Sequence, residues 1–88
     1  MMANAPNGWK KTVDNDTVIA YSKKNYVIYI WKHKTPTKHF CVEPFRKLAN
    51  YKRRLFTKKF SKFSEAKKFA WSLMKQKEIR GYYLKDQG

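Results

Sequence analysis

The chain has 88 residues, which is enough for one domain but too few for two independent hydrophobic cores. It carries 21 Lys and Arg against 6 Asp and Glu, a formal net charge of +15, which points to a polyanionic partner such as DNA, RNA or an anionic membrane surface. Aromatic residues make up 17% of the chain, which excludes a disordered polycation because such chains are poor in aromatics.

The first quarter of the chain predicts a tail followed by a pair of strands. Residues 1–8 are small, polar and interrupted by Pro and Gly, so we expect a flexible N-terminal tail. Alternation in residues 9–13 and β-branched and aromatic residues in 17–23 predict two strands. Residues 14–16, Asp-Asn-Asp, have the side chains that favour a turn between them.

The middle of the chain continues the predicted meander. Residues 26–34, YVIYIWKHK, form the strongest strand pattern, and residues 24–25 are a plausible tight turn before it. A Pro-containing turn at 35–37 leads to a fourth strand at 38–45. Residues 46–54, RKLANYKRR, lack periodicity and predict an exposed basic connection.

The last third predicts one short strand and one helix. Residues 55–60 suit the strand, and the helix is expected to open with Ser64 as N-cap and Glu65 complementing the helix dipole. Gly81 is expected to stop the helix, after Lys75, Lys77 and Arg80 in its last turns. The apolar stripe at helical spacing comprises Ala66, Phe69, Ala70 and Leu73.

The fold class is therefore α+β, with an antiparallel β-meander of four to five strands packed on one C-terminal α-helix in a single domain over residues 9–88. One helix can cover only one face of such a sheet. Strand alternation assigns the aliphatic face, suited to the helix, to Ile28, Ile30, Phe40 and Val42. It assigns the opposite face to Tyr29, Trp31, His33, His39 and Phe45. An uncovered aromatic face suits either the stacking of bases or docking of a second copy, which would make a homodimer.

Basic residues are concentrated in the middle of the chain. Between Pro44 and Ser64 there are eight Lys and Arg and no acid, with Tyr51, Phe56 and Phe60 interleaved. Cations bind phosphates, and flat side chains between the cations can stack on bases. This combination of residues favours binding of single strands over duplexes. Phe56, Phe60, Phe63 and Phe69 are assigned to the core. The candidate phosphate-binding residues are Lys32, Lys34, Lys38, Arg46, Lys47, Lys52, Arg53, Arg54, Lys58 and Lys59. The candidate stacking residues are Tyr29, Trp31 and Tyr51.

Other chemistry finds little support in these residues. The acids are not clustered to hold Mg²⁺ and no Gly-rich phosphate loop exists, so we expect no enzyme activity, no cofactor and no small-molecule substrate. His33, His39 and Cys41 would leave a structural zinc site without its fourth ligand, so we expect no metal and no Cys–His nucleophile. A single cysteine excludes an intrachain disulfide.

A membrane role ranks below nucleic acid in this sequence. No apolar run approaches the ~20 residues that cross a bilayer, and residues 1–8 have no signal-peptide pattern. The basic charge is spread over every segment instead of being concentrated on one amphipathic helix. We therefore expect a cytoplasmic protein, associated with the nucleoid if its partner is DNA.

The layout from Gly8-Trp9 through the meander to FSKFSEAKKFA at residues 60–70 resembles small basic archaeal proteins of the ThermoDBP-like, single-stranded-DNA-binding group. This resemblance implies binding of single strands through the open sheet face, and self-association. Neither the RNP aromatics of an RRM nor the GXXG loop of a KH domain is present.

The expected function is largely sequence-independent binding of single-stranded DNA or RNA. Two alternatives remain open. The same cations suit a double-stranded DNA or chromatin-type protein, and they also suit a basic interaction module within a ribonucleoprotein assembly.

Overall fold

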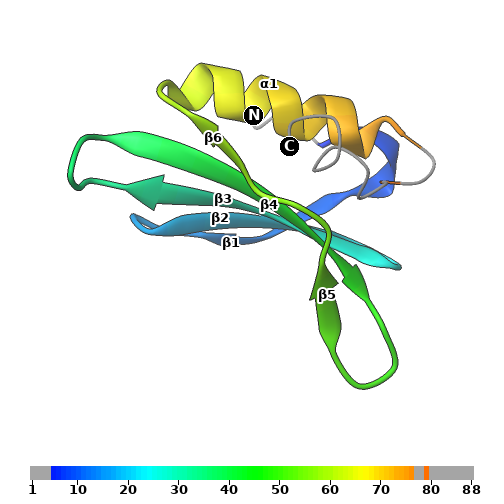
Figure 1. Ribbon diagram of the computed structural model, residues 1–88. Coiled ribbons are helices and arrows are strands. Elements are labelled where there is room, and N and C mark those ends of the chain that lie inside the picture. The colour runs from blue at the N-terminus through cyan, green and yellow to red at the C-terminus, as the bar shows by residue number, and fades with distance from the viewer. Residues whose placement is uncertain (1–4, 77–78, 80–88) are drawn as a thin grey trace.

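The structure is a computed structural model that describes residues 5–76 and residue 79. In this part of the chain, six strands form one antiparallel sheet, and a single α-helix lies across one of its faces (Figure 1). The elements are a short 3-10 turn η1 (Pro6–Gly8), strands β1 (Lys10–Asp14), β2 (Val18–Lys23), β3 (Tyr26–His33), β4 (His39–Lys47), β5 (Lys52–Arg54) and β6 (Lys58–Phe60), and helix α1 (Phe63–Met74). The predicted α+β class is confirmed, with one more strand than the sequence indicated.

The strands β1 to β4 pair in chain order as a meander, and β4 then carries two short partners on its other edge. β6 pairs with the first part of β4, where Phe60 lies opposite Phe40. β5 pairs with the last part, where Arg54 lies opposite Phe45. Because β4 is the longest strand, it connects the layer beneath the helix with a region that extends beyond it (Figure 1).

Two of the predicted turns are confirmed by their hydrogen bonds and positions. The side-chain Oδ1 of Asn15 accepts from the backbone N–H of Thr17 at 2.8 Å and from that of Val18 at 3.0 Å. This pattern is the local capping that makes Asn favourable in turns. Residues 24–25 join β2 to β3 as a two-residue connection, as expected.

The predicted connection at 46–54 is instead part of the sheet. β4 runs on to Lys47, and Lys52–Arg54 returns beside it as β5, closed by a hydrogen bond from the N–H of Leu48 to the carbonyl of Tyr51 at 2.8 Å. Every residue of β5 is exposed. A strand pair with solvent on both faces needs no apolar alternation, so the period-two signal was missing from the sequence.

The helix α1 is shorter than predicted and begins two residues early. Lys62 is the N-cap and makes no side-chain capping bond, so the assignment of Ser64 as N-cap was wrong. Glu65 lies in the first turn, as expected. The helix ends at Met74, before Lys75 and the predicted stop; Lys77, Arg80 and Gly81 lie outside the described residues.

The N-terminal segment meets the end of this helix. Residues 1–4 lie outside the described part of the chain, but Ala5 packs against the core. Asn7 donates a hydrogen bond from Nδ2 to the carbonyl of Met74 at 2.9 Å, which satisfies one of the carbonyls that a helix end leaves unpaired. Part of the expected tail therefore contacts the helix that closes the sheet.

The hydrophobic core lies between the helix and the aliphatic face of the sheet, as predicted. Ile28 and Ile30 in β3 and Val42 in β4 are fully buried, and Leu73 of α1 is buried with them. Phe56, in the segment between β5 and β6, is also buried and meets Phe69 with ring centroids 6.1 Å apart. Within residues 5–76 and residue 79, the structure contains no helical segment with the length and hydropathy of a membrane span.

Candidate nucleic-acid interface

The sheet face opposite the helix carries the predicted aromatic residues. In the pairing of β3 with β4, Val27 lies opposite Phe45, Tyr29 opposite Glu43, and Trp31 opposite Cys41. These positions alternate with the buried Ile28 and Ile30, so their side chains stand on the other face. The prediction that Tyr29, Trp31, His33, His39 and Phe45 share the face without the helix is confirmed.

Three of these rings form a continuous aromatic row, which we define as Phe45, Tyr29 and Trp31. Phe45 meets Tyr29 edge to face with ring centroids 5.4 Å apart, and Tyr29 stacks on Trp31 at 5.5 Å with 28° between the planes. All three side chains are half-buried. Such aromatic contacts contribute about 0.5–1.5 kcal/mol each beyond the area they bury, so the row is ordered by its own packing.

Glu43 fixes the indole of the aromatic row from β4. Trp31 donates from Nε1 to Oε1 of Glu43 at 3.0 Å, and Thr57 donates from its hydroxyl to Oε2 at 2.8 Å. The guanidinium of Arg54 contacts the same Oε2 at 3.5 Å. This role of Glu43 was not expected from the sequence, where the one signal for it is that Glu43 is the only acid between Thr17 and Ser64.

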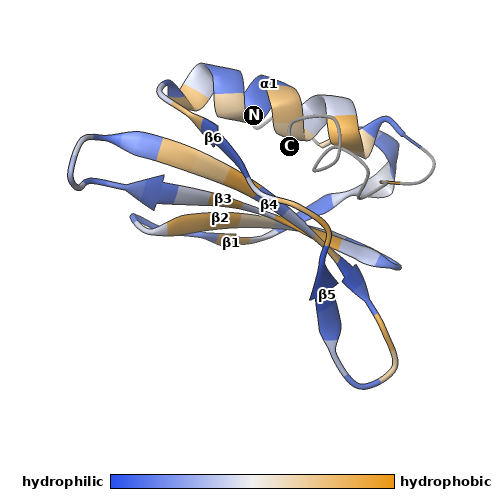
Figure 2. Cartoon of the chain, viewed as in Figure 1, coloured by the Kyte–Doolittle hydropathy of each residue, from blue (hydrophilic) through white to orange (hydrophobic). Residues whose placement is uncertain are grey.

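β5 and the end of β4 form a projecting ribbon, the basic arm, comprising residues 45–54. It extends away from the helix, and its two strands are strongly hydrophilic (Figure 2). Arg46 lies directly opposite Arg53, and Lys47 directly opposite Lys52. Like charges directly opposite each other destabilise a strand pair. The paired cations of the arm therefore repel each other, and a bound polyanion would reduce this repulsion.

Lys52 joins the basic arm to the aromatic row. Its Nζ donates to the hydroxyl of Tyr29 at 2.7 Å and lies 5.3 Å from the centre of the same ring. By strand register, Lys47 and Arg54 face the same side as the row, whereas Arg46 and Arg53 face the other side. Tyr51, at the tip of the arm, is 64% exposed. The structure therefore groups Tyr29, Trp31, Lys47, Lys52 and Arg54, with Tyr51 beyond them.

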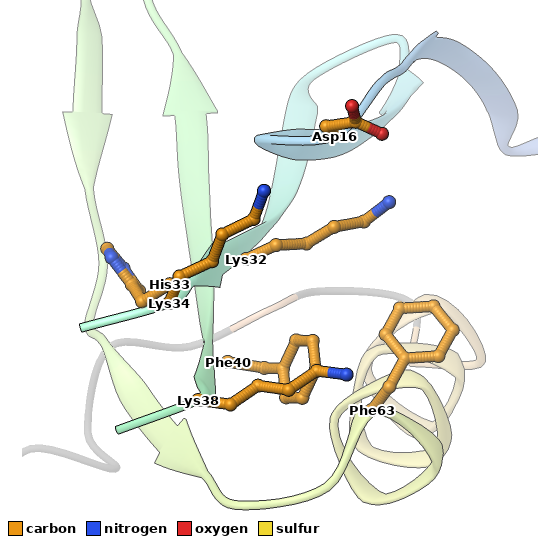
Figure 3. Close-up of a pocket in the computed structure, with 7 residues that line it drawn as sticks. All are labelled: Asp16, Lys32, His33, Lys34, Lys38, Phe40 and Phe63. Carbon is orange, nitrogen blue, oxygen red and sulfur yellow. The ribbon is translucent and has the colours of Figure 1, made fainter. Parts of the chain in front are cut away.

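Other predicted phosphate-binding residues lie apart from this group. Lys32, Lys34 and Lys38 border a groove at the opposite end of β3, where Lys38 extends along Phe40 toward Phe63 (Figure 3). Lys32 is engaged within the protein, because its Nζ donates to the carbonyl of Asn15 at 2.8 Å.

The two lysines of β6 divide between the faces of the sheet. Lys58 stands over the rings of Phe60 and Phe69, 5.8 and 5.1 Å from their centres, on the helix side. Lys59 lies opposite Cys41 and so stands on the open face, near the aromatic row. Lys59 therefore joins the interface, whereas Lys58 covers the edge of the core.

Two histidines and the cysteine meet at the end of the open face. His33 and His39 are opposite each other across β3 and β4 and stack with ring centroids 4.6 Å apart. Cys41 follows on the same face, and one ligand atom from each of the three residues lies within 4.8 Å of the others. Burial raises the pKa of the Cys41 thiol above its ordinary value; the carboxylate of Glu43 adds to the rise and Lys59 opposes it. These residues are the ones that could hold a metal ion.

Comparison with known proteins adds no identification to this geometry. No family model, no curated protein and no solved structure matches the chain.

Proposed function

We propose that the protein binds single-stranded nucleic acid with little sequence preference, through the open face and the basic arm. The aromatic row would contact bases, and Lys47, Lys52, Arg54 and Lys59 would contact phosphates. The observation that carries the proposal is the direct contact between the two parts, made by Lys52 on Tyr29. A strand that lay along the arm would thus reach the rings without a gap in the positive charge.

Two physical features support this reading. The rings of the aromatic row are already held by Glu43 and by one another, so binding a base would cost little additional side-chain entropy. Stacking on an aromatic contributes about 1–3 kcal/mol per base and accepts every base, because each has a π-face. The repulsion between Lys47 and Lys52 would fall when phosphates lie beside them. The resemblance to ThermoDBP-like proteins implies the same activity, and we propose a cytoplasmic location on the same grounds.

The shape of the basic arm favours a second candidate, binding of double-stranded DNA. The arm is a two-stranded ribbon that projects from the body (Figure 1). A two-stranded β-ribbon fits the major groove of B-DNA, which is about 12 Å wide. In that arrangement the arm would enter the groove and the aromatic row would stay outside it.

The experiment that separates the two candidates is a binding titration. Fluorescence anisotropy would be measured with a single-stranded DNA, the single-stranded RNA of the same sequence and the matched duplex, over a series of salt concentrations. We expect the single strands to bind more tightly than the duplex, with an affinity that falls as salt rises. Tighter binding of the duplex would favour the second candidate, and an affinity independent of salt would contradict both.

A further inference from the structure

The cluster of His33, His39 and Cys41 lies outside the group that contacts nucleic acid in the proposal above. His33 and His39 form the last pair of the β3–β4 ladder, and Cys41 stands two residues further along β4 on the same face. In the part of the chain that the structure describes, no other group of three His, Cys, Asp or Glu side chains converges in this way. The sheet register, and not the spacing in the sequence, brings the three together.

The ring of His39 is held in the orientation that a metal ligand needs. Its Nδ1 lies 2.8 Å from the backbone carbonyl of Thr37. A carbonyl oxygen can only accept, so Nδ1 carries the proton and the lone pair lies on Nε2. Metal-binding histidines nearly always donate their second ring N–H to a carbonyl or carboxylate in this manner.

We propose that His33, His39 and Cys41 bind one Zn²⁺ ion, with a water molecule as the fourth ligand. Imidazole and thiolate are the ligands that suit Zn²⁺, whereas Mg²⁺ and Ca²⁺ need oxygen ligands. As the zinc–sulfur bond forms, the thiol proton passes to solvent. A structural zinc site has four protein ligands, and three residues therefore argue against a site of that kind. Zinc sites with three protein ligands also occur, and they keep the fourth position open for water.

Closing the site needs a turn of one imidazole ring, because the rings of His33 and His39 stack with 14° between their planes and their in-plane lone pairs do not converge on one point. Zinc bond lengths place tetrahedral ligand atoms about 3.3–3.7 Å apart, so the separations of up to 4.8 Å would shorten by about 1 Å. His33 is exposed and has room to turn its ring by a side-chain rotation. Cys41 and His39 are half-buried on the same strand and would stay in place. The positive field of the protein opposes a cation, and the thiolate offsets part of this opposition.

The test uses Co²⁺ as a spectroscopic substitute for Zn²⁺ on the full chain, prepared without a histidine tag and under reducing conditions. We expect tetrahedral d–d absorption in the visible, a thiolate-to-cobalt band in the near-ultraviolet, one ion bound per chain, and loss of both signals when Zn²⁺ is added. Binding of Zn²⁺ should also raise the melting temperature of the unmodified protein.

Variants decide whether these three side chains are the ligands. Cys41→Ser should abolish the near-ultraviolet band, and His39→Gln or His33→Gln should weaken Co²⁺ binding by about tenfold or more. Lys34→Gln, at the exposed position next to His33, is the matched control and should keep both bands. Circular dichroism of each variant without metal confirms that the fold is retained. An unmodified protein without a thiolate band, or variants that keep full affinity while folded, would overturn the proposal.

Discussion

Ile30 and Trp31 are neighbours in β3 but belong to two different surfaces. Ile30 is fully buried beneath α1, within the hydrophobic core cluster. Trp31 is half-buried on the other face, where its indole N–H is paired with Glu43. The same strand therefore contributes to the buried core on one face and to a partly solvent-exposed aromatic surface on the other.

The helix, which packs on one face of the sheet and leaves the other open, explains this division. On the covered face, burial of apolar area stabilises the fold, at roughly 25 cal/mol per Å². On the open face, Trp31 and Tyr29 each have a hydrogen-bonding group that is paired at the surface, with Glu43 and Lys52 respectively. Substitutions on the covered face should thus change stability, and substitutions on the open face should change binding.

The largest effect is expected on the covered face. Ile30→Ala should lower the free energy of unfolding by about 2–5 kcal/mol, because it leaves a cavity under the helix. Urea unfolding followed by circular dichroism measures this loss. Val13→Ala is the control, since Val13 is 39% exposed on β1 and should change stability little. If Ile30→Ala prevents folding, the milder Ile30→Val should still cost about 0.5–1.5 kcal/mol. Equal losses at Ile30 and Val13 would remove the distinction between the faces.

The next effect compares two half-buried tryptophans. Trp31→Ala should weaken single-strand binding by about 1–3 kcal/mol, or roughly 5- to 150-fold, if one base stacks there. Trp71 on α1, which meets Tyr21 edge to face at 5.2 Å, is the matched control. Trp71→Ala should reduce stability and leave the affinity of the folded protein unchanged. Anisotropy titrations of both variants give the comparison, and an equal loss of affinity at the two sites would contradict the assignment of bases to the open face.

A smaller effect should appear at the basic arm. Lys47→Gln, on the side of the arm that faces the aromatic row, should lower the slope of log affinity against log salt by about 0.7 for the one phosphate contact removed. Because it also removes the repulsion with Lys52, which lies directly opposite, it should raise the free energy of unfolding by about 0.2–1 kcal/mol. Lys68→Gln, on an exposed position of α1, serves as the control for charge alone. If both variants lowered the slope equally, binding would not depend on the arm.

The smallest effect is expected at Glu43. Glu43→Gln retains a carbonyl oxygen that can accept from the indole of Trp31 but removes the negative charge beside the aromatic row. Single-strand affinity should rise by about two- to fivefold, the range expected for one screened surface charge. Isothermal titration calorimetry at low salt would measure the gain. A loss of affinity would show that the carboxylate is needed for more than its contact with the indole.

Much of the interface could be predicted from strand alternation alone. The separation of Ile28 and Ile30 from Tyr29 and Trp31 follows from the period of two, and one amphipathic helix can cover only one side. The basic character of the arm was predicted but its strand pairing was not, because both faces of the ribbon are exposed and leave no periodic pattern. The helix start was missed because Lys62, without a side-chain capping bond, occupies the position that Ser64 was expected to fill.

The sequence by itself determined the α+β class, the excess of positive charge and the set of side chains on each face of the central strands. The tertiary structure alone decided which side chains meet: Lys52 contacts Tyr29, Glu43 contacts Trp31, and His33 lies beside His39 and Cys41. The physical reason is that alternation depends only on the geometry of one strand. Pairing between strands depends on turn lengths, bulges and the packing of the whole sheet.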